Sequence, residues 1–124
     1  MVRSATGHTF GGYVLHSSPP AAASGFVRAV PAAGSFLFLL ENPHGDPPTV
    51  FEYSNNGQAF HSNSLCGPIF GYNRTHDILI TNDGTSSHTD FPSAYTDTLG
   101  RGKATFTGSR VFNVEDYEVW IATP

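Results

Sequence analysis

Short runs of apolar residues, separated by turn-forming residues, run along most of this chain. In the clearest run, Ser35–Leu40, both the even and the odd positions are apolar. Because strand side chains alternate between two faces, this run predicts a strand that is covered on both sides. Residues 41–48 are rich in turn formers, and Thr49–Tyr53 then resumes a strand-like pattern. The two runs together predict a hairpin with a long loop.

Other strand candidates are shorter and are interrupted by glycine or polar residues. They are residues 9–16, 59–61, 67–71, 77–81, 103–107 and 111–121. Gly11 and Gly12 interrupt the first of these, which predicts a bulge or a close approach of another group to the backbone. The parity of apolar positions changes within the last segment, which predicts a bulge near Glu115–Asp116.

The segments between the strand candidates have loop compositions. Residues 17–34 are rich in Ala, Pro, Ser and Gly, which predicts a long loop that either holds a short helical turn or serves in binding. Residues 82–90 read as a polar loop, and 91–98 fit no regular pattern. The chain as a whole predicts one all-β domain over residues 1–124. We expect an antiparallel β-sandwich of about seven short strands with long loops and little helix.

Composition and charge narrow the possible functions. The 124 residues include 13 Gly and 9 Pro, which disfavours a helical bundle. The net charge of −4, with only six scattered Lys and Arg, predicts no nucleic-acid binding. No apolar run reaches the roughly 18 residues of a membrane span, so we expect no membrane insertion. With one cysteine, Cys66, and no secretory pattern at the N-terminus, we expect a cytoplasmic location.

Six histidines and one acidic loop raise the question of a metal site. No two histidines have the i, i+2 or i, i+4 spacing that local zinc ligands share, and no cysteine pair accompanies them. Residues 82–90 offer oxygen ligands but lack the alternating acidic register of an EF-hand loop. We therefore expect no metal and no other cofactor.

Catalytic chemistry has one candidate grouping, His76 and Asp77 together with Cys66. A histidine beside a carboxylate could act as acid and base, and a thiol could act as nucleophile, if the fold brings them together. The structural interpretation of these residues is that Asp77 caps a turn or accepts backbone N–H bonds and that Cys66 is an inert, buried residue. We favour the structural interpretation because no nucleophile or cofactor motif joins these residues.

Several short sequence motifs, in the correct order, resemble the C-terminal part of a TLDc domain. They are Phe10–Tyr13, Ser35–Leu40, Asn63–Ser64 with Gly67–Gly71, His76–Ile80, Phe106–Ser109 and Phe112–Trp120. The resemblance implies a β-sandwich with peripheral helices, from a family of eukaryotic proteins tied to resistance to oxidative stress. Domains of that family have a further N-terminal half, absent here, before the motif at Phe10–Tyr13, so the resemblance implies a minimal version, a fragment or a divergent use of the sandwich. Several members bind the vacuolar proton pump. The residues that resemble positions kept in the family are His76, Asp77, Glu115 and Glu118.

Three functions follow as hypotheses. The first is a non-enzymatic interaction or structural module that docks onto a larger protein assembly or forms a homo-oligomer, with Trp120, Phe91 and Tyr95 as exposed anchors. The second is a hydrolase or redox enzyme centred on His76, Asp77 and Cys66. The third is a sandwich that binds a small ligand or a sugar through loops at one end. We rank the interaction module first, and expect His76, Asp77, Glu115, Glu118 and Trp120 to contribute to binding.

Overall fold

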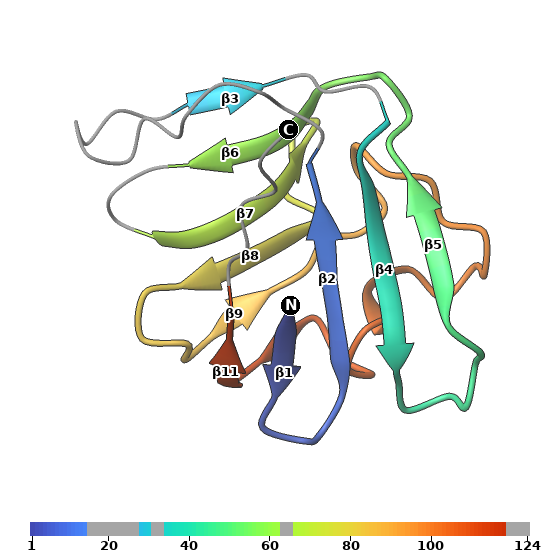
Figure 1. The fold of residues 1–124 in the computed structure, drawn as a ribbon, viewed down its shortest axis with the longest axis vertical. Helices are drawn as coiled ribbons and strands as arrows, with labels where there is room; N and C mark the ends of the chain where they lie inside the picture. The colour runs from blue at the N-terminus through green and yellow to red at the C-terminus, as the bar shows by residue number, and fades with distance from the viewer. Residues whose placement is uncertain (15–27, 31–33, 63–65, 119–124) are drawn as a thin grey trace.

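Two antiparallel sheets packed face to face make up the molecule. The computed structural model describes residues 1–14, 28–30, 34–62 and 66–118, with 28–30, 61–62 and 66–67 described by their backbone alone. Sheet A has five strands and sheet B has six, which confirms the predicted all-β sandwich. In Figure 1 the strands of sheet A run vertically, and those of sheet B run across them. Within the described residues, no helix has the length and apolar character needed to cross a membrane.

The spatial order of the strands differs from their order along the chain. Sheet A consists of β11 (Val114–Tyr117), β1 (Val2–Ser4), β2 (Thr9–Tyr13), β4 (Phe36–Glu41) and β5 (Thr49–Glu52), in that order. Sheet B consists of β10 (Val111–Phe112), β9 (Ser87–His88), β8 (Ile78–Thr81), β7 (Cys66–Tyr72), β6 (Gln58–Ser62) and β3 (Arg28–Val30). The described residues thus form eleven strands rather than about seven. Strands β3 and β9 fall in segments predicted as loops, because runs of two or three residues carry no alternation to detect.

Aromatic side chains fill much of the space between the sheets. Phe10 of β2 and Phe51 of β5 lie against Phe106, with ring centroids 5.0 and 6.0 Å apart. Phe91 contacts Phe51 and Phe106, and Phe112 of β10 packs edge-on against Phe10. All five rings are at most 7% exposed. Such tilted and edge-to-face pairs stabilise a core beyond the burial of their area.

The hairpin of β4 and β5 forms as predicted, but β4 is covered on one face only. Leu37 and Leu39 are fully buried in the core. Phe36 and Phe38 are half-buried on the opposite face, and Leu40 is 40% exposed. The prediction of a strand covered on both sides is therefore wrong, because no described element packs over this outer face of sheet A.

The glycine pair in β2 permits the close approach that its position predicts. A Cβ on Gly11 would lie 2.7 Å from the ring of Phe38, its cross-strand neighbour on β4. A Cβ on Gly12 would lie 2.5 Å from the ring of Phe70 in sheet B. The first glycine accommodates an aromatic ring on the outer face of sheet A, and the second accommodates a partly buried ring that packs against the core.

The C-terminal segment changes sheets and contains the predicted bulge. Strand β10 belongs to sheet B and β11 to sheet A, with Asn113 between them. On β11, Asp116 pairs with Arg3 and Val114 pairs with Ser4, so Glu115 is the extra residue. The register therefore confirms a bulge at the predicted site.

Two predictions about the connecting segments are wrong. Residues 103–107 form no strand, since the short 3₁₀ helix η2 (Gly102–Ala104) and a turn occupy this stretch. The carboxylate of Asp97 accepts the backbone N–H groups of residues 99, 100 and 102, which curls the chain into this loop. Phe91 and Tyr95, expected as exposed anchors, are only 1% and 2% exposed. They fill the core because the loop that carries them lies along the edge of β5, where the backbones of residues 94–96 and 52–54 are hydrogen-bonded.

Candidate functional site

Asp77 is a buried structural carboxylate at the start of β8. One oxygen accepts the backbone N–H of Ser93 at 2.7 Å and that of Tyr95 at 3.3 Å, and the other accepts that of Ala94 at 2.7 Å. Burial raises the pKa of Asp77 to about 6, although these backbone donors act to lower it. A side chain at Gly71, where φ is +81°, would overlap the carboxylate. Asp77 therefore holds the 93–95 loop in place, as its structural interpretation predicts.

The structure does not bring the catalytic candidates together. His76 lies half-buried beside the ring of Tyr72, with centroids 5.2 Å apart. The backbone of Cys66 pairs with Thr81, at the end of β8 opposite Asp77. At about 3.3 Å per residue, four residues of strand separate the backbones by roughly 13 Å. This separation is far beyond the reach of a hydrogen bond between a nucleophile and its base.

Glu115 and Glu118 lie well away from the His76–Asp77 pair. Glu115 is exposed in the β11 bulge, 3.8 Å from the guanidinium of Arg3. The backbone N–H of Glu118 donates to the carbonyl of Met1, and its side chain is exposed. Trp120 lies outside the described residues. The four of these residues that the structure describes therefore do not form one site.

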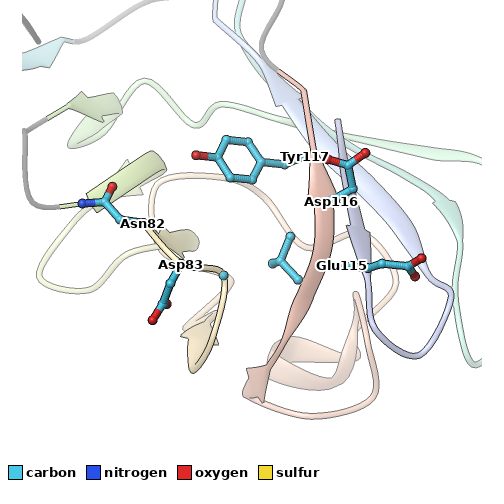
Figure 2. Close-up of a pocket in the computed structure, with 7 residues that line it drawn as sticks. Asn82, Asp83, Glu115, Asp116 and Tyr117 are labelled. Atoms are coloured by element: carbon cyan, nitrogen blue, oxygen red, sulfur yellow. The ribbon is translucent and has the colours of Figure 1, made fainter.

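A small acidic cleft separates the turn after β8 from β11. It encloses about 150 Å³ and is lined by Asn82, Asp83, Gly84 and residues 114–117. Figure 2 shows Tyr117 on the same side of β11 as Asn82 and Asp83, whereas Glu115 points to the opposite side. Asp83 already accepts hydrogen bonds from Thr81 and Thr85. Among the described residues, no three His, Cys, Asp or Glu side chains are grouped so that they could hold a metal ion.

The outer face of sheet A is the most distinctive surface of the described residues. The large hydrophobic residues that are exposed in the described part of the chain are Met1, Tyr13, Leu40, Val50, Tyr72 and Val111. Three of them, together with the half-buried Phe36 and Phe38, lie on adjacent strands of sheet A. We call Tyr13, Phe36, Phe38, Leu40 and Val50 the outer apolar face.

Cross-strand pairing organises the outer apolar face. Phe38 pairs with Gly11 on one side and with Val50 on the other, and its ring lies over the glycine. Phe36 pairs with Tyr13, and their rings stack with centroids 5.2 Å apart and planes 26° apart. Strands β2, β4 and β5 lie side by side in Figure 1, so these side chains form one continuous patch. Surface aromatics held in this way present apolar area at little cost in side-chain entropy.

A shallow depression lies at one end of the outer apolar face. It encloses about 210 Å³, and its lining includes Phe36, Val50, Glu52, Tyr53 and Asn55. Glu52 is exposed and pairs across the strands with Phe36. Its carboxylate forms no ion pair with a cation among the described residues. The depression thus combines an aromatic wall with a carboxylate that lacks a counter-ion in the described structure.

Sequence reasoning missed this surface, although a signal for it was present. In Thr49–Tyr53, Val50 and Glu52 share one parity, while Phe51 and Tyr53 share the other. A glutamate on one face indicates that this face of β5 meets solvent. Because β4 and β5 form a hairpin, their outer faces are continuous, so the same signal applied to Phe36 and Phe38.

Comparison with known proteins assigns this chain to no family. No protein-family model, no curated protein and no solved structure matches the chain.

Proposed function

We propose that this chain is a TLDc-like, non-enzymatic interaction module that docks a partner protein through the outer apolar face. The observation that carries the proposal is the exposure of this face, where apolar residues from three neighbouring strands form one patch. Contiguous exposed apolar surface marks interaction sites more often than isolated exposed residues do. The TLDc resemblance points to a large cytoplasmic assembly as the partner. Members of that family are linked to the vacuolar proton pump and to resistance to oxidative stress.

The neighbouring sheet edge supports docking on the face rather than strand addition. The carbonyl of Glu52 on β5 accepts the backbone N–H of Thr96, and the N–H of Ser54 donates to Ala94. Pro47 and Pro48 precede β5 and cannot donate a backbone hydrogen bond. Edge strands that are paired or preceded by proline resist the addition of another strand.

The other two hypotheses have less support in the geometry. A depression of about 210 Å³ is smaller than the roughly 300–1,000 Å³ of typical small-ligand pockets. The enzyme hypothesis requires Cys66 to meet His76 and Asp77, and the register places Cys66 at the other end of β8. An interaction module requires neither a large pocket nor a catalytic cluster.

Docking can be tested with a matched pair of lysine substitutions. Val50 on β5 is 51% exposed and Val111 on β10 is 50% exposed, so Val50→Lys and Val111→Lys add the same charge at equally exposed positions. Affinity capture from cytosol of the source organism, followed by quantitative mass spectrometry, would compare both variants with the wild type. A lysine charge introduced into the apolar interface should cost about 2 kcal/mol or more, roughly 30-fold in affinity.

We expect Val50→Lys to lose a partner that the wild type and Val111→Lys both retain. Thermal melting of all three proteins establishes that each is folded. Equal capture of every partner by the two variants would refute docking on this face.

A further inference from the structure

The depression beside β5 has the features of a receptor for one cationic side chain. Its aromatic wall is Phe36, which stacks on Tyr13, and its lining includes Val50. Long basic side chains place their methylene groups on apolar surface while the charged head stays at the rim. A volume of about 210 Å³ is on the scale of one or two such side chains and is too small for a folded element.

The charge of the lining residues determines which kind of side chain the depression favours. Glu52 lines the depression and has no cationic partner in the described part of the chain. Asn55, held at φ +63° in the following turn, lines the same depression and adds an amide. The chain carries a net charge of −4, so its overall field also attracts cations.

We infer that the depression receives an arginine side chain from the docked partner. Arginine is favoured over lysine because its planar guanidinium both stacks on aromatic rings and forms paired hydrogen bonds with a carboxylate. Phe36 supplies the ring, and Glu52 supplies the carboxylate. The inference rests on the proposed docking function and specifies the chemistry of the partner at this end of the face.

A fragment-scale binding experiment tests this site without the unidentified partner. The probe is N-acetyl-arginine methylamide, and its uncharged analogue, N-acetyl-citrulline methylamide, is the control. Binding is followed by the backbone amide NMR shifts of Phe36, Val50 and Glu52 during titration. A probe of this size should bind with a dissociation constant of the order of millimolar. We expect these amides to respond to the arginine probe and not to the citrulline probe.

A matched pair of carboxylate variants tests the role of Glu52. Glu52→Gln should weaken binding of the arginine probe about tenfold, because a charge-assisted hydrogen bond is lost. Glu41→Gln removes a carboxylate at the other end of β4 and should leave the affinity unchanged. Added salt should weaken wild-type binding, since both charges are solvent-accessible.

Three results would overturn the assignment. They are the absence of shifts at these amides, equal binding of the citrulline probe, and equal binding of the corresponding lysine probe. None of these results bears on the comparison of Val50→Lys with Val111→Lys. A failed arginine site and a failed docking face are therefore separate outcomes.

Discussion

Asp77 makes the stability of this protein depend on pH in a direction opposite to that of a typical surface carboxylate. Its carboxyl group is fully buried, and burial raises its pKa from 3.8 to about 6. The folded state therefore binds a proton that the unfolded chain has already released between these values. By linkage, the resulting stabilisation is fully present below pH 3.8 and is lost as the pH rises through about 6.

The size of this pH-dependent stabilisation follows from the rise in the pKa of Asp77. One pKa unit corresponds to about 1.4 kcal/mol, so a rise from 3.8 to about 6 is worth up to about 3 kcal/mol. Asp46, Asp83 and Asp90 contribute in the opposite sense, because hydrogen bonds lower their pKa values. Their contributions to stability are lost as the pH falls below the usual range of an aspartate, and a mutation at Asp77 leaves them in place.

Urea denaturation of the wild type and Asp77→Asn at several pH values between 4 and 7 isolates this contribution. Asparagine is a neutral group of the same shape, so the variant lacks the titration while contributions from all other groups cancel in the difference. Between about pH 4 and 7, the difference in unfolding free energy should move in favour of Asp77→Asn by up to about 3 kcal/mol. A difference that stays constant over this range would show that the three backbone donors offset the burial completely, and would refute the reasoning.

Two further predictions concern the packing of the sandwich. Gly12→Ala should lower the free energy of unfolding by about 1–3 kcal/mol, because the new methyl group would lie 2.5 Å from the ring of Phe70, which packs between the sheets against the core. Gly11→Ala should cost less in the same urea titration, since the ring it meets lies on the outer face and can move into solvent; an equal cost would contradict this account. Tyr95→Phe should destabilise the protein by about 1–3 kcal/mol, because it removes the 2.7 Å hydrogen bond to the carbonyl of Ala59. An unchanged urea midpoint in Tyr95→Phe would mean that the carbonyl finds another partner.

Local patterns identified the strands that have clear alternation and the defects within them. The parity change in the last segment indicated the extra residue that the register places at Glu115. The glycine pair in β2 indicated a close approach, and both glycines face aromatic rings. These features depend on neighbours within one strand or on the adjacent strand, so the order of residues contains the information.

The run of β4 does not by itself predict the outer apolar face, and the acceptor role predicted for Asp77 does not indicate which backbone groups donate to it. The doubly apolar run of β4 has the same pattern whether one face or both faces are covered. Which of these occurs depends on whether another element packs over sheet A. Likewise, the donors to Asp77 come from residues 93–95, which follow it by 16 to 18 positions along the chain.

The sequence by itself determined the fold class, the hairpin of β4 and β5, and the positions where strands bend. It did so because side-chain alternation and turn chemistry act over a few residues. The tertiary structure alone decided how far Phe36 and Phe38 remain exposed and that Phe91 and Tyr95 are buried. Whether a residue is buried depends on how the sheets and loops pack together. The apolar character of a side chain shows that its burial is favourable, but it does not show whether the fold buries it.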